Sequence, residues 1–325
     1  MSKGAKPDLP QDWGTPLCAA ICVGSFDMAS RLIEAGADVN RPSEVNAPIT
    51  HVLDIQTPLQ TAIEKRNNQL VNLLLDSHAD INYSHDGMRL GAALKTAIAC
   101  KNRDTVRLLL SRGADPGSAM SLASEIPDTD SPVDLEIFRM LINHNVKVNP
   151  HLWEMASPHG FHLTPLQAAI ERGHKELARM LLEAGADFNA PALGKWGKTA
   201  LQAAAGSGSF SFVEDFVSRG ANVNAPPALE RGATALQFAA IHGHYNIAVF
   251  LLENGADVNA PKAAVDGRTA LEGAAEHGRL DIVHLLLEND QEEESLAQRC
   301  QETAVFAEGN GHYVIAEILR GWKKP

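Results

Sequence analysis

Short apolar patches alternate with glycines along this chain. In the clearest segment, Leu166 and Ile170 fall on one face of a short predicted helix, and Leu177 and Leu181 fall on one face of a second. Gly173 lies between the two patches, where the backbone must turn sharply. The pattern therefore predicts a pair of short helices joined by a tight turn.

The same pattern returns at a fixed step of 35 residues. Four segments begin with Thr, then Pro or Ala, then Leu and Gln or Glu, and they start at Thr164, Thr199, Thr234 and Thr269. A threonine hydroxyl can cap a helix, and proline is tolerated at its first position, so each segment predicts a helix start. A second block, typified by Gly255-Ala256-Asp257-Val258-Asn259, keeps the same step and predicts a turn that leads into an extended finger.

Helices this short are marginal alone, so neighbouring pairs must stack to bury their Leu and Ala faces. The expected fold is an all-α solenoid with short β-like fingers. Thr-Pro-Leu, Gly-His, Leu-Leu and Gly-Ala-Asp-Val-Asn follow in the order typical of the ankyrin repeat, and the chain resembles ankyrin-repeat proteins from about Thr15 to Trp322. Its 35-residue step and Asn-Ala-Pro fingers are similar to the type common in fungal ankyrin proteins.

Nine units are expected, with helix pairs near residues 15–35, 57–77, 92–112, 118–144, 164–184, 199–219, 234–254, 269–289 and 302–321. The run Glu292-Glu293-Glu294 before the ninth unit is expected to be a solvated loop. The predicted organisation is an N-terminal tail (1–14), repeats 1–3 (15–117), a degenerate repeat 4 with a long finger (118–163), repeats 5–8 (164–290) and a C-terminal capping repeat (291–325). Such a cap indicates a whole array.

Composition narrows the expected partners. The 325 residues have a formal net charge of −12, which disfavours nucleic acid and membrane surfaces as partners. The first ten residues contain no apolar core of a signal peptide, and four cysteines form no disulfide framework. These features predict a cytoplasmic or nuclear protein.

In ankyrin proteins the fingers and the concave ends of the first helices carry recognition. The resemblance therefore implies a protein-interaction module, a scaffold or adaptor, that needs no cofactor and no metal. Its partner-binding residues at the helix ends would be Glu171, Arg172, His242, Glu276 and His277. Those in the fingers would be Tyr83, Arg89, Trp196 and Lys198.

The long finger of repeat 4 is the most unusual segment, and two interpretations of it stay open. Trp153 and Phe161 belong either to the partner-binding surface or to a cover over an irregular stack. The alternative function is an enzyme or small-molecule binder with a pocket at the repeat 4/5 junction, where Glu154, His159 and His162 would be the catalytic residues.

Two further expectations concern recurrent positions. His174, His244 and His312 follow Gly at the turn between helices, so they are expected to hold the stack together through hydrogen bonds. The resemblance also implies that the finger asparagines are positions that asparaginyl hydroxylases modify in some ankyrin proteins; they are Asn40, Asn82, Asn189, Asn224 and Asn259.

Overall fold

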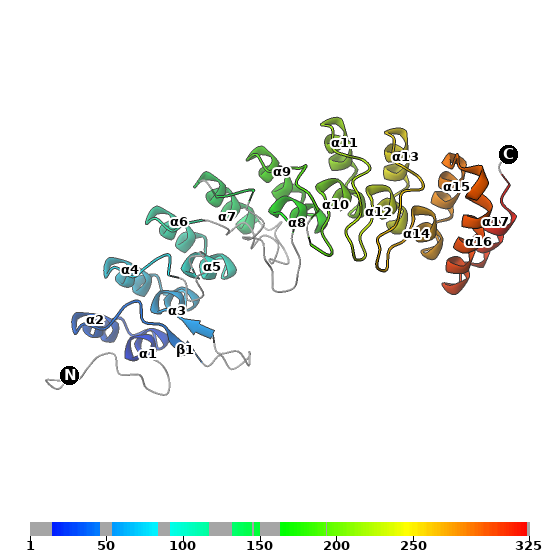
Figure 1. The fold of residues 1–325 in the computed structure, drawn as a ribbon. Helices are drawn as coiled ribbons and strands as arrows, with labels where there is room; N and C mark the ends of the chain where they lie inside the picture. Colours follow the sequence, from blue (N-terminus) through cyan, green and yellow to red (C-terminus); the bar gives the residue numbers. More distant parts are fainter. Residues whose placement is uncertain are drawn as a thin grey trace. The chain divides into compact units, whose positions relative to one another are not determined.

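The computed structural model describes residues 15–45, 54–83, 92–116, 132–144, 146–149, 163–192 and 194–323. The chain divides into two compact units, Met1–Lys147 and Val148–Pro325, and each is described by itself. In both units short helices follow one another in antiparallel pairs (Figure 1).

The first unit holds three helix pairs, one further helix and a small sheet. Its helices are α1 (Pro16–Cys22), α2 (Phe26–Glu34), α3 (Pro58–Glu64), α4 (Asn68–Asp76), α5 (Ala92–Ala99), α6 (Arg103–Ser111) and α7 (Pro132–Asn143). Strands β1 (Ser43–Val45) and β2 (Asp54–Gln56) pair antiparallel within the first long finger. The helix expected to pair with α7 lies outside the described residues.

The second unit holds five helix pairs. Its helices are α8 (Pro165–Glu171), α9 (Lys175–Glu183), α10 (Ala200–Gly206), α11 (Phe210–Ser218), α12 (Ala235–His242), α13 (Tyr245–Glu253), α14 (Ala270–Glu276), α15 (Leu280–Asn289), α16 (Glu293–Gly309) and α17 (Tyr313–Gly321). The first helices of the pairs pack side by side in one row and the second helices in another (Figure 1). The expected all-α fold of stacked helix pairs is confirmed.

The predicted threonine caps begin the first helices of the repeats. The hydroxyl of Thr234 accepts the backbone N–H of Gln237 at 3.3 Å, while the Gln237 side chain accepts the N–H of Thr234 at 2.9 Å. This reciprocal capping box stabilises a helix start by about 1 kcal/mol. The same arrangement begins α3, α8, α10 and α14.

The capping glutamine also ties each first helix to the finger that follows its own helix pair. Its amide Nε2 donates to the carbonyl of the alanine in the following Asn-Ala-Pro finger, from Gln167 to Ala190, from Gln202 to Ala225 and from Gln237 to Ala260, at 2.9–3.1 Å. All three glutamines are buried, so this bond satisfies a donor and an acceptor that water cannot reach.

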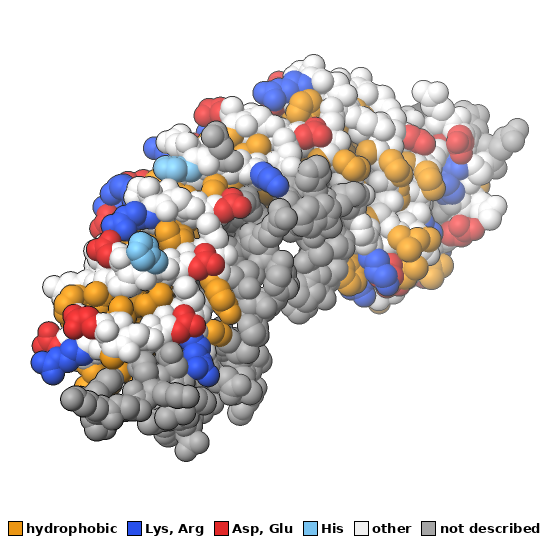
Figure 2. Space-filling model, turned by 60° about the vertical axis from the view of Figure 1, so that its left-hand side comes forward, with side chains coloured by type: hydrophobic (Ala, Val, Ile, Leu, Met, Phe, Trp, Pro, Cys, Tyr) orange, Lys and Arg blue, Asp and Glu red, His pale blue; other side chains and the backbone are white. Residues whose placement is uncertain are grey.

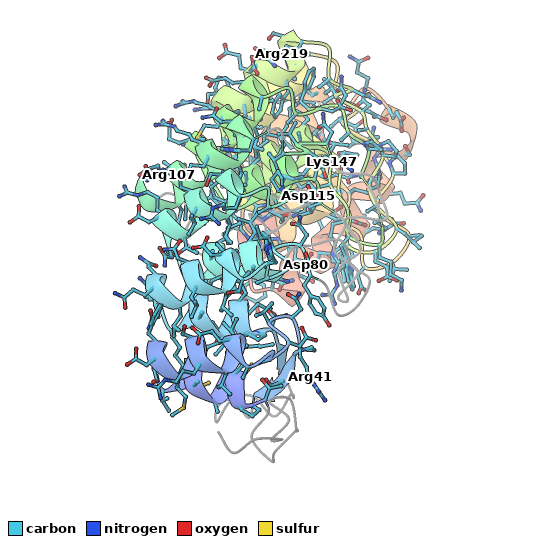
Figure 3. The ribbon with its side chains drawn as sticks, turned by 90° about the vertical axis from the view of Figure 1, so that its left-hand side faces the viewer. Arg41, Asp80, Arg107, Asp115, Lys147 and Arg219 are labelled. Carbon is cyan, nitrogen blue, oxygen red and sulfur yellow. The ribbon has the colours of Figure 1, made fainter. Side chains whose placement is uncertain are left out.

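The finger asparagines form a ladder between units. Asn224 Oδ1 accepts the backbone N–H of Asp257 at 2.8 Å, and its Nδ2 donates to the carbonyl of Gly255 at 2.9 Å. In the first unit Asn40 and Asn82 accept in the same way from Asp80 and Asp115. Both aspartates lie along one edge of that unit (Figure 3).

Tight contacts fix the turns between paired helices. Gly208 has φ +74°, and a Cβ there would lie 2.7 Å from the ring of His244, whose Nε2 bonds to the carbonyl of Gly206 at 3.1 Å. Gly278 has φ +72°, and a Cβ there would lie 2.6 Å from the ring of His312. The structural role predicted for the turn histidines is therefore confirmed at His244.

The last helix pair differs from the prediction. Helix α16 begins at Glu293, nine residues before the expected residue 302. The acidic run therefore begins a helix, and the prediction of a loop there was wrong. Carboxylates are favourable at a helix N-terminus, and Leu296 and Cys300 at helical spacing are buried. Among the described residues, no helix is long and apolar enough to cross a membrane.

Candidate partner-binding groove

Three successive fingers of the second unit are joined by backbone hydrogen bonds. The N–H of Glu230 donates to the carbonyl of Lys195 at 3.0 Å, and the N–H of Arg231 donates to the carbonyl of Val265 at 2.9 Å. Val265 in turn donates to the carbonyl of Leu229 at 3.1 Å. The fingers therefore form one connected surface.

The tips of the second and third of these fingers are strained turns. Arg231 and Asp266 have φ of 52° and 53°, a region that residues with a Cβ rarely adopt. Gly232 and Gly267 follow them, and a Cβ at either would lie 2.3–2.4 Å from backbone atoms of Ala228 or Ala263. These turns therefore fix the backbone positions from which the side chains of Arg231 and Asp266 extend.

Ion pairs link neighbouring fingers and helix ends. Lys195 pairs with Glu230 at 2.8 Å, Arg231 with Asp266 at 3.4 Å, and Lys198 with Glu171 at the end of α8. Acidic and basic side chains also lie next to one another on the face shown in Figure 2. The Arg231–Asp266 pair is exposed on both sides and is therefore worth about 0–1 kcal/mol, so a partner can replace it at low cost.

Lys198 lies between a carboxylate and an aromatic ring. Its Nζ is 4.8 Å from the centre of the Phe238 ring, which belongs to α12 and is 6% exposed. A lysine over a phenylalanine face is attracted by about 0.5–1 kcal/mol. Glu171 and Phe238 together hold the ammonium over the groove floor, beside Trp196, which is 36% exposed.

These elements enclose a groove of about 550 Å³. Its lining residues come from two first helices and three fingers: Glu171, Trp196, Lys198, Glu230, Arg231, Gly232, Phe238, Val265 and Asp266. The structure thus brings together Glu171, Trp196 and Lys198, three of the residues expected from the sequence to bind a partner. The groove combines an apolar floor with charged sides.

Further expected residues lie at the ends of the first helices. The ring Nδ1 of His242 lies 2.9 Å from the carbonyl of Phe238, and the ring Nδ1 of His277 lies 3.0 Å from that of Gly273. Glu276 pairs with Arg268 at 2.6 Å, and this hydrogen bond raises the pKa of the Arg268 guanidinium.

The remaining predicted residues are not gathered at this groove. Arg172 is the exposed C-cap of α8. Tyr83 belongs to the first unit, where its N–H donates to the carbonyl of Asp80 at 3.4 Å. The other candidates lie outside the described residues; they are Arg89, Trp153, Glu154, His159, Phe161 and His162.

Sequence reasoning missed Phe238, Arg231, Val265 and Asp266. Phe238 stands where the aligned Thr-X-Leu-Gln segments carry threonine (Thr61) or alanine (Ala168, Ala203), so this single large residue was a visible signal. The finger-tip residues carried a signal of position, because Arg231 and Asp266 stand 35 and 70 residues after Trp196, at the same place in the repeat. Their left-handed turns were not visible in the sequence. Among the described residues, no group of three or more His, Cys, Asp or Glu is placed to hold a metal ion.

Comparison with known protein families gives three matches. A model of ankyrin repeats in three copies matches residues 44–120, 192–262 and 226–297. A model of many ankyrin repeats matches residues 166–217, and a single ankyrin repeat matches residues 13–44.

Curated relatives share the repeats over part of their length. Rabankyrin-5 of Homo sapiens is 28% identical over 192 residues, which is 58% of this chain and 15% of that protein. In Mus musculus, the B-cell lymphoma 3 protein homolog is 30% identical over 53% of this chain and 36% of its own length. Ankyrin repeat and SOCS box protein 5 of the same species is 32% identical over 35% of this chain and 30% of its own length. The chain thus spans 15–36% of these three relatives.

Proposed function

Since this chain belongs to the ankyrin-repeat family, whose members are protein-interaction modules, we propose that its second unit binds a partner protein in the groove around Trp196 and Phe238. The observation that carries the proposal is the meeting of Trp196, Lys198 and Phe238 in one groove. Aromatic residues beside a cation are enriched at the centres of protein interfaces.

The groove chemistry defines the kind of segment it would hold. Trp196 and Val265, which are 36% and 45% exposed, offer apolar surface for an aromatic or aliphatic anchor. Arg231 is the most exposed cation in the groove, with 75% of its side chain accessible, and its bond to Asp266 is long at 3.4 Å. It can turn to a carboxylate of the partner, so an acidic residue beside the anchor would suit the groove.

The partner-binding surface would extend along the helix ends to Arg172, His242, Glu276 and His277. Tyr83, Arg89, Trp153 and Phe161 stay predictions for the rest of the chain. The 35-residue step and the Asn-Ala-Pro fingers support similarity to the fungal type of array. The proposed division remains 1–14, 15–117, 118–163, 164–290 and 291–325.

Two cellular expectations complete the proposal. All four cysteines are free thiols, which supports a reducing compartment, the cytoplasm or the nucleus. The net charge of −12 supports a protein partner over nucleic acid or a membrane surface.

The test compares two variants with matched losses. Trp196→Ala/Arg231→Ala/Asp266→Ala removes an aromatic ring and an ion pair from the groove. Phe26→Ala/Glu176→Ala/Arg179→Ala removes the same kinds of group from α2 and α9, where Glu176 and Arg179 pair at 2.6 Å. Quantitative affinity purification from the native host should lose partners with the first variant and keep them with the second. Equal recovery with both would overturn the proposal.

A further inference from the structure

The second helices of the second unit begin with large apolar residues that face solvent. Phe210, Tyr245, Leu280 and Tyr313 occupy the first position of α11, α13, α15 and α17, and they are 39%, 41%, 38% and 65% exposed. The corresponding residue of α9 is an exposed lysine, Lys175, so the stack itself does not require an apolar side chain there. We call the four apolar residues the outer ridge.

Two grooves separate three members of the outer ridge, Phe210, Tyr245 and Leu280. The groove between α11 and α13 measures about 430 Å³, and there Phe210 meets Phe250 edge to face with ring centres 5.4 Å apart. The groove between α13 and α15 measures about 680 Å³ and is lined by Leu280 and Leu285. Tyr245 lines both grooves, so the two grooves form one continuous surface.

Carboxylates line this surface without a lysine or arginine from α13 or α15 to neutralise them, and His284 lines the second groove beside two of them. Glu253 lies in the first groove, and Asp281 and Glu288 lie in the second. All three are exposed, and none has an ion-pair partner among the residues that the structure describes. The finger groove differs, because Glu171, Glu230 and Asp266 are all paired there.

We propose that the outer ridge and its three carboxylates bind a cationic amphipathic helix of a partner protein. Packed neighbouring helices lie about 10 Å apart. A helix crossing them rises 1.5 Å per residue, so apolar residues about seven positions apart would meet successive grooves. Lysines or arginines beside them would reach Glu253, Asp281 and Glu288. This second interface does not depend on the finger groove.

The test uses the full chain and two designed helical peptides. One carries leucines at heptad spacing with lysines elsewhere, and the other carries the same leucines with glutamates. Fluorescence anisotropy should show binding of the leucine–lysine peptide only. Glu253→Gln/Asp281→Asn/Glu288→Gln should weaken that binding about tenfold, if each lost charge pair contributes about 0.5 kcal/mol.

Two controls separate this face from general charge and from loss of fold. Asp27→Asn/Asp76→Asn/Asp104→Asn removes three carboxylates from second helices of the first unit, and it should leave binding unchanged. Tyr245→Ser/Leu280→Ser changes exposed residues only, so the chain should fold and lose binding. Equal weakening by both charge variants, or equal binding of the leucine–glutamate peptide, would overturn the proposal. Light scattering that shows a wild-type dimer, abolished by Tyr245→Ser/Leu280→Ser, would overturn it in favour of a second copy of the chain.

Discussion

The ammonium of Lys198 lies 4.8 Å from the centre of the Phe238 ring, although one residue precedes α10 and the other lies in α12. The contact exists because the repeat step places these first helices next to each other. Gly206 of α10 lies against the Phe238 side chain, since a Cβ there would be in van der Waals contact with it at 3.7 Å. The wall of the proposed binding groove is therefore a product of stacking.

The first prediction concerns the glutamine ladder. Gln237→Glu keeps the acceptor for the N–H of Thr234 but loses the donor to the carbonyl of Ala260, and it sets a carboxylate beside that oxygen. We expect a loss of about 2 kcal/mol in the free energy of unfolding, measured by urea denaturation. An unchanged midpoint would show that the bond from α12 to the following finger contributes nothing to stability.

The second prediction concerns the one repeat that carries glutamate instead. Glu272 is 7% exposed, and Lys262 donates to both of its carboxylate oxygens at 2.8 and 3.1 Å. Because Lys262 is itself 45% exposed, Lys262→Met should cost only about 1 kcal/mol. Lys262→Met/Glu272→Gln should recover most of this loss in a double-mutant cycle. Additive effects of the two changes would contradict the coupling.

The third prediction separates backbone strain from contact. Gly220 and Gly278 have φ of +86° and +72°, so alanine at either position carries a left-handed cost of about 1–2 kcal/mol. A Cβ at Gly220 meets nothing within 4 Å, whereas one at Gly278 would lie 2.6 Å from the ring of His312. Gly278→Ala should therefore lose about 1–2 kcal/mol more than Gly220→Ala. Adding His312→Ala should remove this difference; equal losses without it would refute the contact.

The fourth prediction concerns pH. Burial alone would raise the pKa of Asp290, but hydrogen bonds from Arg299, Asn259 and the N–H of Glu292 lower it below its ordinary value. A lowered folded pKa stabilises the protein above the unfolded pKa of about 3.9, and this stability is lost as the pH falls through the folded pKa. Asp290→Asn should lose about 2 kcal/mol at pH 7, with the difference narrowing below about pH 4.

Urea denaturation across this pH range checks that prediction. Glu288→Gln, which changes an exposed carboxylate near the C-terminal end of α15, is the matched control and should not lose stability at pH 7. A loss for Asp290→Asn that stays constant from pH 7 to pH 3 would contradict the role of the ionised carboxylate.

Much of the fold follows from local chemistry, so the sequence could predict it. Thr164, Thr199, Thr234 and Thr269 begin helices because a hydroxyl caps wherever the first turn is helical. The glycines that end helices were equally visible. The predicted start of α16 is wrong because a run of glutamates is typical of a solvated loop. The buried residues Leu296 and Cys300, at helical spacing, show that the helix begins earlier.

The candidate groove was only partly predictable. Glu171, Trp196 and Lys198 stand out as variable residues on a constant repeat. Phe238 joins them because of stacking. Arg231 and Asp266 share the repeat position of Trp196, but the backbone hydrogen bonds between their fingers and their left-handed turns are seen only in the structure. Contacts between units depend on the register of the stack, which a single repeat does not reveal.

The most direct test of the central claim is photo-crosslinking in the native host. A benzophenone amino acid would replace Trp196 in one sample, and Phe26, an exposed aromatic residue of α2, in another. We expect a protein partner to crosslink at position 196 and not at position 26. Crosslinking of the same partner at position 26, with none at position 196, would contradict the groove as the partner-binding site.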